Sequence, residues 1–443
     1  MLERKPQGRF CTQAELIQIV HSADIVDKVG RMTQLPTMTK TRRSPSAPSA
    51  ASTNCRLPPS LKRSMTTGID NPHTPGGIRI CTKGAGDTAT VRRCFIDRAQ
   101  KLGLDACLET IEAPDGSCIT FRLAPKLLHA WMPGYDTLEL CTQLRLDSHS
   151  SNTGLEKEIL LAMLAGPVVF EYPNYPELAA SVRIRQNIVN ASRRTALSFH
   201  TSKIERPVDY WTYSEETGFT VLPGKPLIEA LRKATQPEVS GELYAFSCYR
   251  ATEYVILLGL AQELAHSNPL LLDRLQRQWE SRAIMSRQFH DVFTREVGSM
   301  SEPLPEKYYV PGDRLWFRNP DQRSADVIGY EGSWVIYLGA GLFTNFWNPA
   351  SPYSIDSKCI EIYHWRDGVY LDGDGNMQMD ESMVAEHVRA TMQDPDKMED
   401  IVGRMMKLRD PPDVYADGGC IDASREYPRW VCPDSADLVL PPE

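Results

Sequence analysis

The sequence predicts an α+β fold in which a bundle of helices packs on an antiparallel sheet. Residues 155–287 carry long stretches with the helical spacing of apolar side chains, and residues 316–365 carry short alternating and β-branched runs. The glycine-rich turn at 339–341 joins two of those runs and is typical of a tight hairpin. Helices followed by strands therefore indicate a helical layer placed on a sheet.

Composition and charge bound the class of protein. Of the 443 residues, 42% are hydrophobic, which is enough for a sizeable core, so we expect one main domain with appendages. The net charge of −8 offers no basic surface for phosphate groups, and we expect no nucleic-acid partner. The first residues lack the apolar segment of a secretory signal, and no run approaches the roughly 18 apolar residues that span a membrane. These observations predict a cytoplasmic protein without a membrane partner.

The 11 cysteines form no CxxC pair and their number is odd. This pattern argues against a zinc ribbon and against a disulfide framework. A reducing compartment is the simpler inference, because disulfides persist mainly in oxidising ones.

The first third of the chain is predicted to contain a tail and a small appendage. Residues 1–77 are largely Ser, Thr, Pro and basic residues from about Gly30 onward and are expected to be disordered, with a short helix over 13–29. Residues 78–150 predict a small α+β appendage of unknown role, and the stretch at 149–154 predicts a linker. The elements expected in the appendage are a helix over 92–102 and a strand over 117–123.

The main domain is predicted over residues 155–395, followed by an irregular extension over 396–443. The expected helices span 155–165, 176–199, 226–234, 249–265 and 269–287. The expected strands span 316–318, 333–338, 342–346 and 359–365.

Cys248 is the candidate nucleophile. It precedes a run from Ala251 to Leu264 that is apolar on nearly every side, which predicts a buried helix with this cysteine in its first turn. Amide N–H groups without helical partners and the positive end of the helix dipole favour thiolate over thiol at that position. The backbone N–H of Cys248 could also serve as an oxyanion donor. The competing interpretation is an inert buried cysteine.

The run from Pro167 to about Phe346 carries a set of ordered segments: PVVFEYPNYPELAASVRIRQNIVNAS, DYWTYSEETGF, LYAFSCYRATEYVILL, PGDRLWFRNPD and GSWVIYLG. In content and order these segments resemble the protein-glutamine gamma-glutamyltransferases of bacterial spore coats. The resemblance covers roughly residues 155–395 and leaves everything before Leu155 outside. At the level of layout, a nucleophile helix packed on a following antiparallel sheet is similar to papain-like and NlpC/P60-like thiol enzymes.

The resemblance implies a transglutaminase reaction that uses neither a metal nor another cofactor. A thiolate attacks a glutamine carboxamide, ammonia leaves, and a lysine amine resolves the thioester to an ε-(γ-glutamyl)lysine isopeptide bond. Glutamine- and lysine-bearing proteins would be the partners, and a spore coat would be a location. By position, Cys248 matches the nucleophile of the family.

The positions of the family's acid and base partners differ in this chain. Ser247 stands where the family has a glutamate directly before the nucleophile, and Ser333 stands where it has a glutamate after the glycine that opens GSWVIYLG. The family's histidine in the returning hairpin strand is missing too, since Asn345 and Phe346 occupy that neighbourhood.

Glu331 is one candidate for handling protons in their place. It lies two residues before Ser333 and would face the same side of a strand that begins early enough, displaced by about 7 Å along the strand. The alternative is a solvated carboxylate in a turn.

His364 is the second candidate, as a base in the strand predicted over 359–365. Asp367 could orient its imidazole, although a surface turn at Asp367 is the alternative. Because Ile360 and Ile362 would share a strand face with His364, a histidine at the edge of a packed core is the alternative for His364.

Two further patterns, a loop and a Met-rich stretch, follow the main strands. Residues 371–381 open like a calcium loop but have Met377 where the loop needs glycine and Met383 where it needs the bidentate glutamate, so a hairpin turn is predicted. The Met-rich stretch that follows predicts a helix with His387 in a structural position on its apolar face.

The sequence is compatible with three functions. The first is a crosslinking transglutaminase with Cys248 as nucleophile. The second is a glutaminyl deamidase or other thiol amidase, in which water resolves the acyl-enzyme. The third is a catalytically silent descendant that keeps the fold as a binding or structural module.

Overall fold

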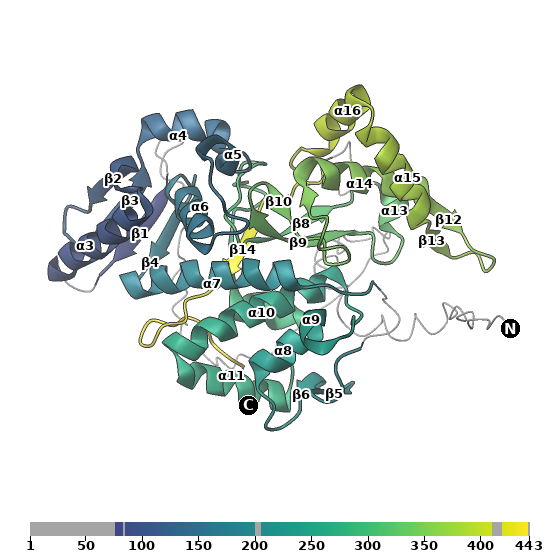
Figure 1. Cartoon of the computed structure of the whole chain (residues 1–443), viewed down its shortest axis with the longest axis horizontal. Helices are drawn as coiled ribbons and strands as arrows, with labels where there is room; N and C mark the ends of the chain where they lie inside the picture. Colours follow the sequence, from purple (N-terminus) through teal and green to yellow (C-terminus); the bar gives the residue numbers. More distant parts are fainter. Residues whose placement is uncertain (1–75, 83–84, 200–204, 410–418, 442–443) are drawn as a thin grey trace, which may run out of the picture. The chain divides into compact units, whose positions relative to one another are not determined.

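The computed structural model describes residues 76–82, 85–199, 205–409 and 419–441 (Figure 1). The predicted disordered tail, apart from its last two residues, and the short helix over 13–29 lie outside the described residues.

A four-stranded sheet with the strand order β2-β3-β1-β4 is formed first. Its strands are β1 (Gly77–Cys81), β2 (Leu108–Glu112), β3 (Cys118–Leu123) and β4 (Val169–Tyr172). The α-helices along this stretch are α3 (Ala85–Leu102), α4 (Pro125–Trp131), α5 (Leu140–Leu144) and α6 (Asn152–Leu164). The helix and strand expected over 92–102 and 117–123 are confirmed. Because β1 also pairs with β4, and Ile78 and Leu161 share one buried core, the division predicted at residue 150 does not coincide with a break in the packing.

Cys81 and Cys118 lie directly opposite each other in β1 and β3 and form a disulfide. The cysteine pattern argued against disulfides, but strand register brings together two residues that are 37 positions apart, and sequence spacing does not reveal register. The cysteine pattern therefore no longer supports the inference of a reducing compartment.

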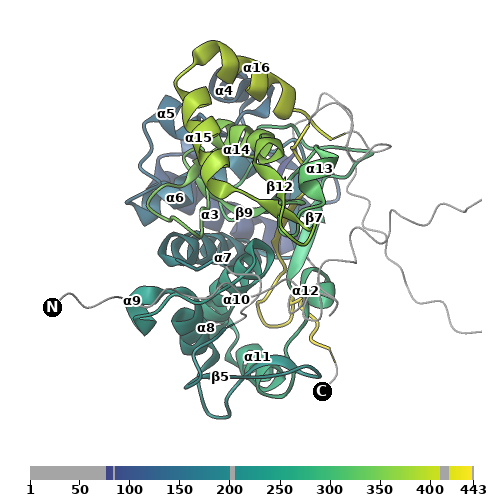
Figure 2. The same cartoon turned by 90° about the vertical axis from the view of Figure 1, so that its right-hand side faces the viewer.

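A helical layer follows, and its centre is α10. The helices are α7 (Tyr175–Arg194), α8 (Leu227–Thr235), α9 (Pro237–Ser240), α10 (Cys248–Ser267), α11 (Pro269–Ser281) and α12 (Ser286–Phe293), and β5 (Trp211–Ser214) and β6 (Gly218–Val221) form a hairpin. α10 packs on α7, α8 and α11 and on strand β9 (Gly332–Gly339) (Figures 1 and 2). The buried apolar helix predicted after Cys248 is confirmed, whereas the helix predicted over 269–287 is two helices with a break at 282–285.

The second sheet has six strands in the order β11-β10-β9-β8-β14-β7, and all its pairs are antiparallel. Besides β9, its strands are β7 (Thr294–Val297), β8 (Arg314–Arg318), β10 (Leu342–Phe343), β11 (Tyr353–Ser354) and β14 (Arg425–Pro428). The strands predicted over 316–318 and 333–338 and the antiparallel pairing are confirmed. The C-terminal extension was predicted to be irregular, but β14 comes from it and lies between β8 and β7 inside the sheet. The mixed helices and sheets confirm the α+β class.

β9 separates two hydrophobic cores. Successive side chains of a strand point to opposite faces, and accordingly Ile336 packs with α7 and α10 while Val335 and Tyr337 pack with α14 (Ile355–Gly368). The strand therefore fixes the position of α10 on one side and of α14 on the other.

The strand predicted over 359–365 is wrong, because these residues form the middle of α14. A short apolar run such as Cys359–Ile362 fits a buried strand or a buried helix equally well, and its sequence alone does not distinguish them. The later elements are α13 (Gln322–Ala325), α15 (Glu381–Met392), α16 (Pro395–Met405), β12 (Val369–Leu371) and β13 (Met377–Met379). The loop that resembles a calcium site joins β12 to β13 as a hairpin, as predicted. Within the described residues, no helix is long and apolar enough to cross a membrane.

Candidate functional site

Cys248 is the first residue of α10 and is an unbridged, half-buried thiol. Ser247 caps the helix, because its hydroxyl accepts a hydrogen bond of 3.3 Å from the backbone N–H of Arg250. The residue that replaces the family's glutamate directly before the nucleophile thus has a structural role in starting the helix.

Several groups act on the Cys248 thiol. Burial raises the pKa of Cys248, and the carboxylate of Glu331 raises it further. The backbone N–H groups of Trp334 and Tyr249 and the ammonium of Lys358 act in the opposite direction. Burial affects the pKa of Cys248 more than the helix terminus does, so the net effect is a raised pKa. The structure therefore does not give the resting cysteine the predicted preference for thiolate.

Trp334 comes to the thiol on β9. Trp334 and Ile336 are two residues apart and share the strand face that meets α10, so the backbone at Trp334 lies beside the first turn of that helix. Gly332, at the start of the strand, permits this approach of β8 and β9, because a Cβ there would lie 2.0 Å from Trp316 Nε1. The side chain of Ser333 makes no hydrogen bond with a described residue.

Glu331 lies immediately before β9, which begins at Gly332. The strand therefore starts one residue too late for Glu331 to share a strand face with Ser333. Its carboxylate nevertheless acts on Cys248. Burial raises the pKa of Glu331, although the Gly329 N–H, which donates a hydrogen bond of 3.2 Å to Oε1, partly offsets that rise. A carboxyl group with a raised pKa beside a thiol is able both to accept and to return a proton.

Lys358 on α14 is a residue of this site that sequence analysis missed. Its side chain is 3% exposed, and its ammonium lies 2.6 Å from Glu361 Oε2 and 3.6 Å from the centre of the Tyr353 ring. Burial alone would lower the pKa of Lys358, but Glu361, Tyr353 and Cys248 together raise it above its usual value, so the ammonium stays charged. Lys358 stands after Asp356 and Ser357 and before Glu361, so its sequence neighbours gave no signal that it is buried.

Aromatic rings gather at Trp334 and Tyr249, the two residues whose backbone N–H groups act on the thiol. The indoles of Trp316 and Trp334 stack with their centres 5.6 Å apart and their planes 3° from parallel, and the Tyr249 ring meets Trp334 edge-on at 5.1 Å. The guanidinium of Arg314 lies 4.6 Å from the centre of the Trp334 ring on β9. Both indoles are partly exposed and offer flat apolar surface on β8 and β9.

His364, the other predicted base, is engaged elsewhere. Its Nδ1 lies 2.6 Å from Asp367 Oδ2 and its Nε2 lies 2.8 Å from Thr391 Oγ1. The pairing of His364 with Asp367 is present, but among the described residues no hydrogen bond or ion pair joins either of them to Cys248. Glu331 and Lys358 thus act on the pKa of Cys248, whereas His364 belongs to a different cluster.

A cysteine at the N-terminus of a helix, beside backbone N–H groups, is a setting that thiol-dependent acyltransferases use. The family model of protein-glutamine gamma-glutamyltransferase matches residues 138–434, which is more than half of the chain. The chain belongs to this family.

Its similarity to individual relatives is low. A protein-glutamine gamma-glutamyltransferase of Bacillus licheniformis is 26% identical over 170 residues, which are 38% of this chain and 63% of the relative. One of Halalkalibacterium halodurans is 26% identical over 208 residues, 45% of this chain and 66% of the relative. The chain thus spans slightly less than two thirds of the length of each relative. A solved transglutaminase from Geobacillus stearothermophilus, without its C-terminal extension, is 20% identical, with a TM-score of 0.34 over 49% of this chain and 98% of that one.

Proposed function

We propose that the chain is a transglutaminase that forms isopeptide bonds between glutamine and lysine side chains of proteins, with Cys248 as nucleophile. The observation that carries this proposal is the position of Cys248 at the start of α10, where the backbone N–H groups of Trp334 and Tyr249 act on its thiol.

In the first half-reaction, Sγ of Cys248 attacks the side-chain carbonyl carbon of a glutamine. The carbon–nitrogen bond breaks, a thioester forms, and the thiol proton leaves with the departing nitrogen as ammonia. Glu331 supports both transfers, because its carboxylate accepts the thiol proton and its acid form returns the proton to the leaving nitrogen.

In the second half-reaction, a neutral lysine amine attacks the thioester carbon. The carbon–sulfur bond breaks, an amide forms, and the amine proton returns by way of Glu331 to the sulfur. The positive charge of Lys358 stabilises the thiolate each time it forms.

The stacked indoles of Trp316 and Trp334 are the proposed wall for the methylene groups of the substrate side chains. Their apolar faces would hold a glutamine side chain next to Cys248 and would exclude water from the thioester. Exclusion of water favours transfer to an amine over hydrolysis, which separates the crosslinking function from a deamidase.

The test is incorporation of a fluorescent primary amine into casein by purified full-length protein, with ammonia release measured in the same samples. We expect label and ammonia from wild type and neither from Cys248→Ala. Cys94→Ala is the matched control, since Cys94 is a free cysteine of α3 outside the site.

The outcomes separate the remaining candidates. Ammonia without label would replace crosslinking by deamidation, in which water resolves the same acyl-enzyme. Equal signals from wild type and Cys248→Ala would remove Cys248 as the nucleophile, and no signal from either would favour the silent descendant.

A further inference from the structure

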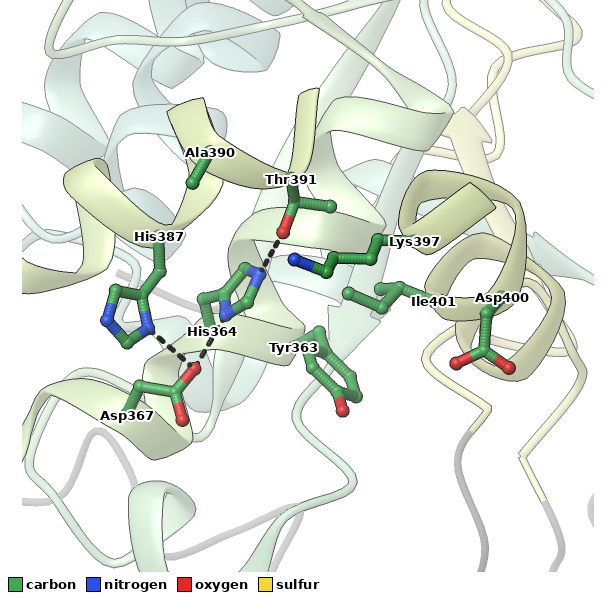
Figure 3. A pocket seen from close by; sticks show the side chains of 9 residues that line it. All are labelled: Tyr363, His364, Asp367, His387, Ala390, Thr391, Lys397, Asp400 and Ile401. Carbon is green, nitrogen blue, oxygen red and sulfur yellow. Dashed lines mark hydrogen bonds and ion pairs between the residues drawn. The ribbon is translucent and has the colours of Figure 1, made fainter. Parts of the chain in front are cut away.

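A cluster of two histidines and an aspartate lies apart from the thiol site, between α14 and α15. His364 and Asp367 are three residues apart on α14 and so share one helix face, and His387 comes from α15 (Figure 3). Asp367 Oδ2 lies 2.6 Å from His364 Nδ1 and 3.1 Å from His387 Nδ1. One carboxylate oxygen is thus shared by two imidazole nitrogens.

We infer that His364, Asp367 and His387 form a binding site for a divalent transition metal ion, with Zn²⁺ as the ion that fits best. One ligand atom from each residue lies within 4.8 Å of the others. Zinc binds imidazole nitrogen and carboxylate oxygen at about 2.0–2.2 Å, which requires ligand atoms about 3.3 Å apart in a tetrahedral site. Small movements of the partly exposed Asp367 and His387 side chains satisfy that requirement.

The second ring nitrogen of His364 supports this inference. His364 is buried, and its Nε2 lies 2.8 Å from Thr391 Oγ1 on α15. A metal-binding imidazole usually uses its other nitrogen in a hydrogen bond that fixes the ring orientation. With Nε2 donating to Thr391, the lone pair of Nδ1 points at Asp367 and His387, where the ion would lie.

The cluster opens onto a hollow of about 440 Å³, which leaves room for one or more water ligands in the remaining coordination positions. Lys397 and Asp400 also line this hollow (Figure 3). Both charges are already paired, since Lys397 Nζ lies 3.2 Å from Asp394 and Asp400 lies 2.8 Å from Arg404. The lysine charge is therefore offset and does not oppose a cation.

Bound metal would join α14 to α15 through side chains that otherwise meet by hydrogen bonds. The ion belongs to the architecture and takes no part in the reaction at Cys248, because no contact among the described residues links the cluster to the thiol. We therefore expect zinc binding to stabilise the fold.

The experiment uses full-length protein freed of metal with a chelator. Zinc chloride is titrated by calorimetry, and thermal unfolding is followed with and without zinc. Wild type is expected to bind one Zn²⁺ and to melt at a higher temperature with it. His387→Ala removes an exposed ligand without disturbing the core, and we expect zinc affinity to fall by about tenfold or more.

Two further variants make the test specific. His290→Ala is the matched control, because His290 is an exposed histidine 2.9 Å from Asp291. Among the described residues it belongs to no cluster with a second histidine. This variant should bind zinc as wild type does. His387→Cys supplies another zinc ligand and should restore binding. Wild type that binds no zinc, or His387→Ala that binds as tightly as wild type, would overturn the site, whatever the outcome of the amine-incorporation assay.

Discussion

Lys358 illustrates how a charge that is costly to bury can be kept at a site. Its ammonium is surrounded by the Glu361 carboxylate and the face of the Tyr353 ring, which together compensate for lost hydration. The positive charge of Lys358 acts to lower the pKa of Cys248, the direction in which a nearby cationic group acts on a thiol.

Lys358→Met should raise the pKa of Cys248, because the charge that favours the thiolate is lost. Alkylation of Cys248 by iodoacetamide should become several-fold slower at neutral pH and should recover at higher pH. The rates follow from mass spectrometry of the Cys248 peptide across a pH series. Lys358→Arg keeps the charge and should stay near wild type, and Lys397→Met should have no effect. An unchanged pH profile for Lys358→Met would remove the lysine from the site.

Glu331→Gln should affect stability and activity in opposite directions. The folded-state pKa of Glu331 is raised by burial, so the folded protein binds a proton more tightly than the unfolded chain does. Wild type therefore loses stability as the pH rises from the ordinary glutamate pKa through the raised value. The variant lacks this loss and should melt higher than wild type at neutral pH, with little difference below the ordinary glutamate pKa.

Amine incorporation by Glu331→Gln should fall by about 10²-fold or more, since proton transfer by a carboxyl group is lost. Melting curves over a pH series and the casein assay measure the two effects. Retained activity together with the melting shift would mean that Glu331 is a buried carboxyl group without a role in catalysis.

At the scale of elements, the close approach of α10 to α7 fixes where the thiol lies. A Cβ at Gly259 would lie 2.6 Å from Ile188 Cγ1 and 3.0 Å from the Ile188 backbone nitrogen. The two helix backbones can only be this close because residue 259 has no side chain.

Gly259→Ala should destabilise the fold by about 1–3 kcal/mol, the usual cost of overpacking a tight core. Gly403→Ala is the matched control, because Gly403 is also helical and has nothing within 4 Å of an added Cβ. That substitution should stabilise by about 0.4–1 kcal/mol, since alanine restricts the unfolded chain. Urea unfolding followed by circular dichroism measures both, and equal effects would show that the helices separate without cost.

The elements differ in how readily the sequence predicts them. α10 was predicted because its apolar run is long, and β9 because a short β-branched and aromatic run ends at the glycine-rich turn. α14 was missed because Ile360, Ile362 and His364 alternate over a run short enough to be a strand. Lys358 was missed for the same reason, whereas the pairing of His364 with Asp367 was predicted and only the place of His387 beside Asp367 was missed. The effect of Glu331 on the pKa of Cys248 could be anticipated only from the family resemblance.

At the scale of the whole molecule, the C-terminal segment completes the fold. β14 occupies an inner position in the six-stranded sheet. Beyond it, the buried carboxylate of Glu177 on α7 accepts hydrogen bonds from the backbone N–H groups of Val431 and Cys432 and from the hydroxyl of Ser435. No periodic apolar pattern marks this segment in the sequence, so its place could not be predicted.

Glu177→Ala should release the segment after β14 and cost about 1–3 kcal/mol, because buried N–H groups lose their acceptor. Limited trypsin digestion should then cut after Arg429 faster than in wild type, and intact-mass measurement identifies the cut. Glu386→Ala, on the exposed face of α15, serves as the control. Unchanged cleavage would show that β14 alone holds the segment.

The inner position of β14 also has a consequence during protein synthesis. Strands β7 and β8 are translated long before Arg425–Pro428, the strand that lies between them. Their sheet can therefore close only after residues 425–428 have been made. Since β9 extends from β8 and carries the Trp334 amide to Cys248, the surroundings of the thiol are completed late. A nascent chain would thus complete the surroundings of the Cys248 thiol only after residues 425–428 have been made, long after the thiol itself.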